Sequence, residues 1–391
     1  MKKLFIVAGE SSGDLQGSVV TRALLEQSPD MQIRALGGPL MQQAGAELVA
    51  DLTGHAVVGL VEGLRSVSRI YATYRRVVGL LKAERPDAVL LIDYPEFNLR
   101  LARRARKLGI PVMYYISPQV WAWRRWRVRI IEKCVDRMLV IFPFEEGFYR
   151  EHGVDAEFVG HPLVDMLADV PDRETARRDL GLGQDELVIG LLPGSRKKEF
   201  EAIFPIMARA AEIIRGSLER PVTFVCAKAP SLDDDLPERL LSGSDLDVKV
   251  VRNDTYRVMR GSDLIITASG TATVEAMILG APMIVVYAVS VITWALFIRL
   301  MKVDRYAMVN IIAGKEIVPE FIQWNATPKR IAREAVSLIN DGRLQQMGDD
   351  LARVTAMLHR PGTPDGTATP ASTDVASGVA ARILNFIDRR V

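Results

Sequence analysis

Short apolar runs recur along the whole chain, and each is followed by a glycine-containing or polar stretch and then by a helical pattern. The runs are rich in Val, Ile and Leu, which is typical of strands buried on both faces of a parallel sheet. Strands that alternate with helices predict an α/β protein. We expect strands at Leu4–Ala8, Ala88–Ile92, Val112–Ile116, Arg137–Ile141, Leu187–Leu191, Val222–Cys226, Val248–Val251, Leu264–Thr267 and Met283–Tyr287.

The stretch between the last two of these strands predicts a phosphate site. Ala268–Thr271 is a small-residue turn, and Ala272–Leu279 is a helix that ends at Gly280. A turn between a strand and a helix N-terminus offers unpaired N–H groups and the positive end of the helix dipole. Gly270 lets an anion approach the backbone, and Ser269 and Thr271 add hydroxyl donors.

Glu275, in the first part of that helix, has two interpretations. Its carboxylate could accept hydrogen bonds from both hydroxyls of a ribose beside the phosphate site. It could equally be an acidic residue that complements the helix dipole. The spacing gives both interpretations equal weight.

Three other strand ends carry candidate chemistry. The turn Gly9–Asp14 places Glu10, Ser11, Ser12, Gly13 and Asp14 at a sheet edge, although Asp14 could simply favour a helix dipole. Asp93 follows Ala88–Ile92, where a carboxylate suits a general base or a helix cap. Gly194, Ser195 and Arg196 follow Leu187–Leu191, and an arginine there can neutralise a diphosphate through bidentate hydrogen bonds.

The chain is expected to form two domains. A second strand–helix series begins after the segment Gly160–Leu163, so we predict domains at 1–162 and 163–365. A Thr-, Ser- and Pro-rich loop precedes an amphipathic segment, 366–391. This last segment either packs back on the first domain or is exchanged between the subunits of a homodimer.

Composition narrows the function classes. The 391 residues are 49% hydrophobic with a formal net charge of +2, which argues against a nucleic-acid partner. Cys134 and Cys226 form no CxxC motif and suggest a reducing compartment, so we expect a cytoplasmic protein without a signal peptide. The run Asp233–Asp235 resembles an acidic metal motif, but an exposed loop is the stronger interpretation, and we expect neither a metal nor a cofactor.

One basic, apolar segment suggests a membrane surface. The stretch from Val57 to Val78 combines an apolar stripe with arginines, a pattern that suits anionic lipid but also a helix packed on the domain core. The residues expected to contact lipid are Val57, Val58, Leu60, Val61, Leu64, Arg65 and Arg69. A second apolar stretch, 281–301, has nearly the length of a membrane span, yet Pro282 and its polar residues favour a strand and a helix.

Seven motifs occur in one order across nearly the whole chain. They are GESSGD, IDYPEFN, SPQVWAWR, FVGHP, LLPGSR, ASGTATVEAM and VNIIAG. Together they resemble the lipid-A-disaccharide synthase family, glycosyltransferases of the GT-B fold. The resemblance implies two Rossmann-like domains whose parallel sheets face each other across a cleft. The chain departs from the family pattern at Ser11 and at Tyr94–Glu96, and Tyr94 adds bulk beside Asp93.

The resemblance also implies a reaction. An inverting transferase of this family joins UDP-2,3-diacylglucosamine to 2,3-diacylglucosamine 1-phosphate on the cytoplasmic face of the inner membrane, as a peripheral protein. The products are the β-1,6-linked disaccharide 1-phosphate and UDP. Asp93 becomes the candidate base, with Glu10 in reserve. Asn310, which we expect in a short connection, matches an active-site position.

The same match distributes the binding roles. Residues assigned to the UDP-sugar are Gly194, Ser195, Arg196, Tyr256, Ser269, Gly270, Thr271 and Glu275. Residues assigned to the acceptor or the N-terminal loop are Ser11, Ser12, Gly13, Asp14 and Asn98. The alternatives are another GT-B enzyme that uses UDP-GlcNAc, such as the GlcNAc transferase of peptidoglycan lipid synthesis or a 2-epimerase, and a non-catalytic nucleotide-binding protein of the membrane surface.

Overall fold

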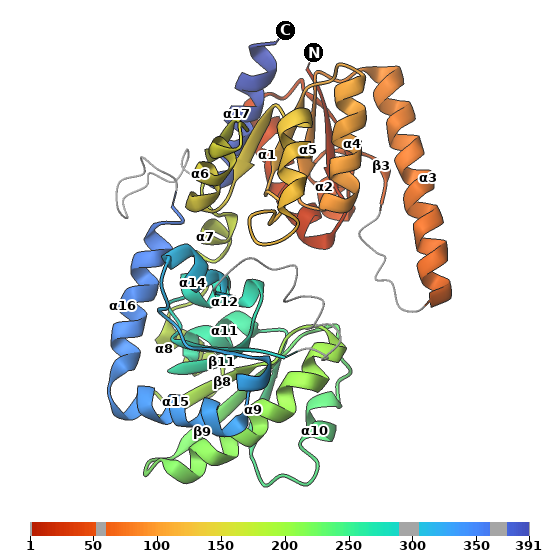
Figure 1. The fold of residues 1–391 in the computed structure, drawn as a ribbon. Coiled ribbons are helices and arrows are strands. Elements are labelled where there is room, and N and C mark those ends of the chain that lie inside the picture. Colours follow the sequence, from red (N-terminus) through yellow and green to blue (C-terminus); the bar gives the residue numbers. More distant parts are fainter. Residues whose placement is uncertain (1, 52–59, 289–304, 360–373, 391) are drawn as a thin grey trace. The chain divides into compact units, whose positions relative to one another are not determined.

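The structure, a computed structural model, describes residues 2–51, 60–288, 305–359 and 374–390, without the side chains of 60–67. The chain divides into two compact units. Unit 1 comprises Met1–Asp165 and Leu358–Val391, and unit 2 comprises Met166–Met357. The ribbon in Figure 1 shows a parallel sheet covered by helices in each unit.

Unit 1 is built on a parallel sheet of seven strands in the order β3-β2-β1-β4-β5-β6-β7. The central strands β4 and β5 are fully buried, as their unbroken apolar sequences predict. The strands are β1 (Lys3–Ala8), β2 (Gln32–Leu36), β3 (Glu47–Ala50), β4 (Ala88–Ile92), β5 (Val112–Tyr115), β6 (Arg137–Val140) and β7 (Ala156–Phe158).

Helices cover both faces of this sheet. The core on one face joins Val77 and Leu81 of α3, Leu101 of α4 and Ile131 of α5 to alternate residues of the strands. The helices of unit 1 are α1 (Ser11–Gln27), α2 (Pro39–Gln43), α3 (Leu60–Glu84), α4 (Pro95–Lys107), η1 (Arg125–Arg127), α5 (Val128–Cys134), α6 (Pro143–Glu151) and α17 (Val375–Asp388), and α7 (Pro162–Met166) lies at the unit boundary.

The C-terminal helix α17 packs against α1 in unit 1 (Figure 1). Asp374 caps the helix by accepting the N–H of Ser377, and the carboxylate of Asp165 accepts the N–H of Val375 at 2.7 Å. Arg382 pairs with Glu157 of β7 through its Nε at 2.5 Å. These contacts join the last described residues to the first domain of the chain.

Unit 2 repeats the architecture with six parallel strands in the order β10-β9-β8-β11-β12-β13. The strands are β8 (Leu187–Leu192), β9 (Val222–Lys228), β10 (Val248–Arg252), β11 (Leu264–Ala268), β12 (Met283–Tyr287) and β13 (Glu320–Ile322). The helices are α8 (Arg173–Asp179), α9 (Lys197–Ser217), α10 (Leu236–Leu240), α11 (Thr255–Gly261), α12 (Thr271–Ile278), α14 (Met308–Ala313), η2 (Gln323–Asn325), α15 (Pro328–Asn340) and α16 (Arg343–Ala356).

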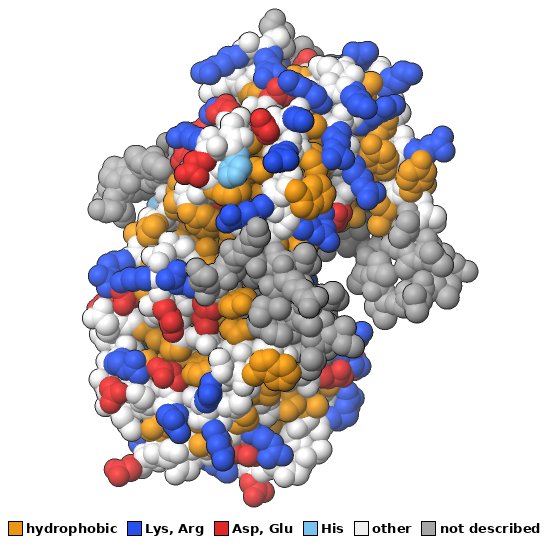
Figure 2. All heavy atoms as spheres, viewed as in Figure 1, with side chains coloured by type: hydrophobic (Ala, Val, Ile, Leu, Met, Phe, Trp, Pro, Cys, Tyr) orange, Lys and Arg blue, Asp and Glu red, His pale blue; other side chains and the backbone are white. Residues whose placement is uncertain are grey.

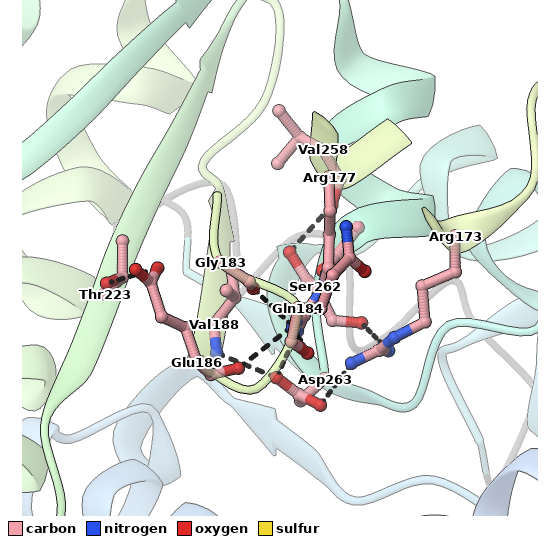
Figure 3. Close-up of polar contacts among 11 residues, drawn as sticks. Arg173, Arg177, Gly183, Gln184, Glu186, Val188, Thr223, Val258, Ser262 and Asp263 are labelled. Atoms are coloured by element: carbon pink, nitrogen blue, oxygen red, sulfur yellow. Dashed lines mark hydrogen bonds and ion pairs between the residues drawn. The ribbon is translucent and has the colours of Figure 1, made fainter. Parts of the chain in front are cut away.

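One buried arginine holds together the edge of the second sheet at which β8 and β11 begin (Figure 3). The guanidinium of Arg177 on α8 pairs with Asp263 at 2.7 Å, and Asp263 also accepts the N–H of Val188. The other N–H groups of the Arg177 guanidinium donate to backbone carbonyls, among them that of Gly261 at 2.8 Å. The cluster lies at the opposite edge from the predicted phosphate turns, and its role is therefore structural.

The strand order fixes where ligands are expected. The order of each sheet reverses between two neighbouring strands, β1 and β4 in unit 1 and β8 and β11 in unit 2. In open parallel sheets, ligands bind beyond the carboxyl ends of the strands at such a reversal. Glu10 and Asp93 follow β1 and β4, while Gly194 and Gly270 follow β8 and β11.

Two local predictions need correction, and two others fall wholly or partly outside the described residues. The N-terminal turn is shorter than expected, because α1 begins at Ser11 rather than near Leu15. Asn310 lies on α14 and not in a connection. Val57 and Val58 lie outside the described residues, and so does most of the apolar stretch 281–301. No helix in the described parts of the chain is long and apolar enough to span a membrane.

Candidate active site

The turn that carries Asp93 has a strained backbone. Asp93 and Tyr94 both adopt the left-handed conformation, with φ values of 46° and 45°. That conformation costs an L-residue about 1–2 kcal/mol, so two in succession need compensating contacts. Ile116 and Arg124, on the connection that follows the neighbouring strand β5, also have positive φ. Strain of this kind concentrates at functional sites, which supports a functional role for this edge.

Neighbouring groups shape the chemistry of Asp93. Burial raises the pKa of Asp93 to about 6, and the nearby carboxylate of Glu10 adds to the rise. Glu10 itself is exposed at the N-cap of α1. The two acidic residues therefore lie close enough to interact, as neighbouring strand ends predict. A carboxylate whose pKa lies near 6 is ionised at neutral pH and is a stronger base than an ordinary aspartate.

The backbone carbonyl of Asp93 accepts hydrogen bonds from two buried side chains. The hydroxyl of Tyr114 on β5 donates to it at 2.5 Å, and Nδ2 of Asn98 donates at 2.7 Å. Asn98, assigned from the sequence to the acceptor site, is fully buried and also donates to the carbonyl of Ile92. Both amide hydrogens of Asn98 thus serve the turn itself.

Tyr94 lies against Gly9 on the neighbouring strand end. A Cβ at Gly9 would come within 2.2 Å of the Tyr94 ring, so only glycine allows this contact. The Tyr94 ring also stacks on Phe97, with ring centroids 5.8 Å apart. The extra bulk of Tyr94, noted in the sequence, therefore covers the end of β1.

The next connection is attached to the Asp93 turn by ion pairs. Arg127, which is buried, donates to both carboxylate oxygens of Glu96 at 2.7 and 2.8 Å, and Arg124 donates to the same carboxylate at 2.7 Å. These bonds, together with close charges, lower the pKa of Glu96 although burial works against them. Glu96 is the second residue of α4, so the pairs hold the helix that begins directly after Tyr94.

Glu145 is a buried carboxyl that the sequence did not single out. It accepts hydrogen bonds from the hydroxyl of Ser117 at 2.6 Å and from the indole of Trp121 at 3.0 Å. Burial raises the pKa of Glu145 to about 7, and these hydrogen bonds oppose the rise. The signal that could have found it is its place three residues after Phe142, because Glu145 also accepts the Phe142 N–H as in a capping box.

The remaining residues of the N-terminal loop divide into two groups. Ser11 and Ser12 are exposed in the first turn of α1. Asp14 is buried, and its carboxylate accepts the N–H groups of Gly38, Leu40 and Met41 at the start of α2. Gly13 is buried close to Ala8. Asp14 thus fixes the start of α2, whose N–H groups lie 24 or more residues further along the chain.

The two turns of unit 2 lie side by side because β8 and β11 are paired, with Leu192 opposite Thr267. Gly194 has a φ of 108°, and a Cβ there would meet the carboxylate of Glu199 at 2.6 Å. Ser195 and Arg196 are exposed. Burial raises the pKa of Glu199, whereas the charge of Arg196 lowers it.

The second turn is open. Gly270 is exposed at the N-cap of α12, and a Cβ placed there would meet nothing within 4 Å. Thr271 is exposed as well, whereas the N–H of Ser269 donates to Val286 within the sheet at 3.0 Å. The free space around Gly270 is what a phosphate approaching the helix N-terminus requires.

Glu275 and Tyr256 meet beside this turn. The hydroxyl of Tyr256, on α11, donates to Oε1 of Glu275 at 3.2 Å. Burial raises the pKa of Glu275, and the bond from Tyr256 opposes that rise, while burial raises the pKa of Tyr256 to about 12. The N-cap residue of α12, Gly270, makes no side-chain cap hydrogen bond, and the carboxylate of Glu275 keeps acceptor capacity beside the bond from Tyr256.

Asn310 is fully engaged within unit 2. Its Nδ2 donates to the Val318 carbonyl at 2.9 Å and to Glu320 at 2.6 Å. Its Oδ1 accepts the N–H groups of Ile317 and Val318. The amide is 0% exposed and has used all its hydrogen-bonding capacity, so it holds the segment before β13 in place.

The acidic run and His161 have structural partners. Asp233, Asp234 and Asp235 pair with Lys197, Lys228 and Arg239, respectively. Among the described residues, no group of His, Cys or acidic side chains could hold a metal ion. His161 is buried against Phe142, and burial lowers its pKa to about 4.

Only part of the helix that was predicted to contact lipid has described side chains. Leu60, Val61, Leu64 and Arg65 lie on α3, but their side chains are outside the described set. Arg69 and Tyr71 are exposed, whereas Val77 and Leu81 belong to the core. The C-terminal half of α3 therefore uses its apolar stripe for packing.

Two parallel-sheet units, each with candidate ligand groups at its strand-order reversal, define the GT-B class. Solved structures agree. The structure titled "S. aureus MnaA-UDP co-structure" has a TM-score of 0.64 at 12% identity, covering 100% of this chain and 98% of that one. The MurG structure from Acinetobacter baumannii has a TM-score of 0.56 at 14% identity and covers 100% of both chains. At these identities the likeness shows the fold alone.

Sequence comparison gives the family. The family model for lipid-A-disaccharide synthetase matches residues 4–365. The lipid-A-disaccharide synthase of Syntrophus aciditrophicus is 41% identical over 374 residues, which are 95% of this chain and 97% of that protein. That of Geobacter sulfurreducens is 44% identical over 342 residues, or 87% and 88% of the two chains. The chain belongs to the lipid-A-disaccharide synthase family, and the rival UDP-GlcNAc enzymes are not favoured.

Proposed function

We propose that this protein transfers a 2,3-diacylglucosamine unit from UDP to the 6-hydroxyl of 2,3-diacylglucosamine 1-phosphate. The products are the β-1,6-linked disaccharide 1-phosphate and UDP. The observation that carries the proposal, besides family membership, is the Asp93 carboxyl: it is held at a strand-order reversal beside Glu10, and its pKa is raised to about 6.

In this proposal unit 1 supplies the base. The 6-hydroxyl oxygen of the acceptor attacks the anomeric carbon, and its proton passes to the carboxylate of Asp93. The bond from the anomeric carbon to the UDP oxygen breaks, and its electron pair leaves with UDP. One such in-line displacement inverts the anomeric configuration. Glu10, exposed next to Asp93, orients the acceptor or serves as the reserve base.

Unit 2 holds the donor in the same proposal. Arg196 and the N-terminus of α12 balance the charge that develops on the diphosphate as it leaves. Glu275 accepts the ribose hydroxyls, and Tyr256 orients its carboxylate through the 3.2 Å hydrogen bond. Asn310, whose amide is saturated, acts by holding the segment before β13 and not by touching substrate. The residues that line the two adjacent turns are Gly194, Ser195, Ser269, Gly270 and Thr271.

Peripheral membrane contact through unit 1 belongs to the proposal as well. Exposed arginines and lysines lie on α3, α4 and α5, and Figure 2 draws such basic side chains with hydrophobic ones among them. Tyr71 and Trp126 are 61% and 60% exposed. Aromatic and basic side chains together suit an anionic membrane surface. Flotation with vesicles that contain anionic lipid tests this part, and charge reversal at Arg75 and Arg76 should weaken it.

The reaction is tested by a product assay. Purified protein is mixed with UDP-2,3-diacylglucosamine and 2,3-diacylglucosamine 1-phosphate in detergent with EDTA, and products are identified by mass spectrometry. Disaccharide 1-phosphate plus UDP is the expected result. Consumption of UDP-GlcNAc with the acylated donor left intact would keep the fold and overturn the substrate assignment.

A further inference from the structure

The hydroxyl of Tyr114 is buried against the turn that carries Asp93. Tyr114 lies on β5, directly opposite Leu91 of β4, and is 0% exposed. Its hydroxyl donates to the Asp93 carbonyl at 2.5 Å. Water cannot replace this acceptor in a fully buried position, so the bond depends on where the Asp93 carbonyl points.

That direction exists only because the turn is strained. Asp93 and Tyr94 both have positive φ, and this conformation turns the Asp93 carbonyl towards Tyr114 and Asn98. A flip of the peptide unit between Asp93 and Tyr94 would relieve Tyr94, but it would rotate the carbonyl away from both buried donors. The two donors therefore favour the strained conformation over the relaxed one.

The conformation of the turn also sets the position of the Asp93 side chain, because Cβ leaves the same backbone. We propose that Tyr114 is a positioning residue for the transfer reaction, one that fixes the Asp93 backbone so that the carboxylate meets the acceptor hydroxyl. The inference rests on the proposed function, in which Asp93 is the base. Tyr114 touches no substrate and acts only through Asp93.

Tyr114 is a better probe of this device than Asn98. Asn98 lies in the first turns of α4 and also donates to the Ile92 carbonyl, so its replacement disturbs a helix and a strand together. Tyr114→Phe removes one oxygen atom and leaves the ring in the core. Tyr149→Phe is the matched control, because Tyr149 is 0% exposed in the same core and its hydroxyl donates to a different carbonyl, that of Pro118, at 3.0 Å.

The experiment compares the two variants with the wild type in the disaccharide assay from about pH 5 to about pH 9. This range begins above the ordinary pKa of a carboxyl group and includes that of histidine. We expect Tyr114→Phe to lower kcat roughly tenfold, since a misplaced catalytic group costs up to about a hundredfold. KM for both substrates should stay within about twofold. The acid limb of kcat should move to lower pH, because a relaxed turn exposes the carboxyl to water.

The control, Tyr149→Phe, tests a purely structural hydroxyl and should give a different pattern. It should lower the thermal midpoint by as much as Tyr114→Phe does, while its kcat and the acid limb of its pH profile stay at the wild-type values. Wild-type kcat and an unmoved acid limb in Tyr114→Phe would overturn the inference. So would the same acid-limb shift in both variants.

A second readout separates this inference from the proposed function. The protein is labelled with aspartate carrying ¹³C in the side-chain carboxyl, and the Asp93 signal is assigned by its loss in Asp93→Asn. We expect this carboxyl to titrate near pH 6 in the wild type and in Tyr149→Phe, and lower in Tyr114→Phe. If the wild type makes no disaccharide, the proposed function fails, yet the titration still decides the inference: an unchanged Asp93 titration in Tyr114→Phe overturns it.

Discussion

The two strand-order reversals in this protein are built in opposite ways. In unit 1 the turn at Asp93 is strained, half-buried and held by hydrogen bonds from Tyr114 and Asn98. In unit 2 the turn at Gly270 is exposed, and a Cβ there would touch nothing. The difference fits their proposed tasks: a base must be held at a fixed position and pKa, whereas a phosphate site must leave backbone N–H groups free for the ligand.

The contrast between the two turns would be wrong if the carboxylate of Asp93 proved unnecessary for turnover. Asp93→Asn keeps the shape of the side chain and removes its basicity, so we expect turnover to fall by about 10²–10⁴-fold, the usual contribution of a general base. UDP affinity, which the proposal assigns to unit 2, should be unchanged. Kinetics and calorimetry with UDP measure the two quantities. Glu10→Gln is the control, and if it alone abolishes turnover, Glu10 is the base.

Asn310 tests the comparison from the side of unit 2, because all the hydrogen-bonding groups of its side chain have partners within that unit. Asn310→Ala leaves the half-buried N–H of Ile317 and the buried N–H of Val318 without their acceptor, and the buried one alone costs about 1–3 kcal/mol. We expect a clear fall in the free energy of unfolding, measured by urea denaturation. A variant that keeps wild-type stability but loses turnover would show that the amide takes part in the chemistry.

The elevated pKa of Asp93 predicts a gain of stability from the same substitution that removes activity. A carboxyl whose folded pKa is raised stabilises the fold below its unfolded pKa, and that contribution is lost as pH rises through about 6. Asp93→Asn should therefore be more stable than the wild type at about pH 8, by at most about 3 kcal/mol for a shift of about two pKa units. The gain should fade as the pH falls from about 6 to about 4, the ordinary aspartate pKa. Equal stability at every pH would mean that the carboxyl is not held in a desolvated position.

A pair of glycines tests the two turns directly. Gly9 follows β1 and is covered by the Tyr94 ring, whereas Gly270 follows β11 and is open. Gly9→Ala forces the ring to move, and overpacking of this kind costs about 1–3 kcal/mol. Gly270→Ala should leave the thermal midpoint unchanged and weaken UDP binding roughly tenfold, equal to about 1.4 kcal/mol. A loss of stability in Gly270→Ala, with UDP affinity intact, would show that the phosphate does not bind at this turn.

Much of this arrangement could be predicted from the sequence. The apolar runs that end shortly before Asp93 and Gly270 predicted the strands and therefore the sheet edges, because a buried parallel strand needs an unbroken apolar sequence. Strand order is not a local property, however. That these edges lie at the reversals β1–β4 and β8–β11 follows only from the assembled sheets.

The missed features depend on contacts between distant segments. The Ser-Ser-Gly sequence after Glu10 is typical of a turn, but α1 begins at Ser11 and directs Asp14 to the start of α2. Tyr114 is one more aromatic residue in an apolar run, and nothing local indicates that its hydroxyl reaches Asp93. Asn310 was expected in a connection but lies on α14, and its amide is saturated by the segment 317–320, which follows it by several residues.

The smallest effect is expected at Tyr256, where unit 2 has its own orienting hydrogen bond. Tyr256→Phe removes the 3.2 Å bond to Glu275, a side chain that is only half-buried. Because that bond lowers the pKa of Glu275 against the effect of burial, its loss should raise this pKa further. A single hydrogen bond contributes about 0.5–1.5 kcal/mol, so KM for the UDP donor should rise by at most about tenfold, with KM for the acceptor unchanged.

Glu275→Gln separates the two functions of this pair, since it keeps an acceptor for Tyr256 but removes the charge that would bind the ribose hydroxyls. If the ribose is held there, the donor KM should rise more in Glu275→Gln than in Tyr256→Phe. An acceptor KM that changes instead would move Glu275 out of the donor site. If neither KM changed, the bond from Tyr256 to Glu275 would serve folding alone. The proposed task of the bond from Tyr114 in unit 1 is to position the base, so the contrast between the two turns would then extend to the side chains that support them.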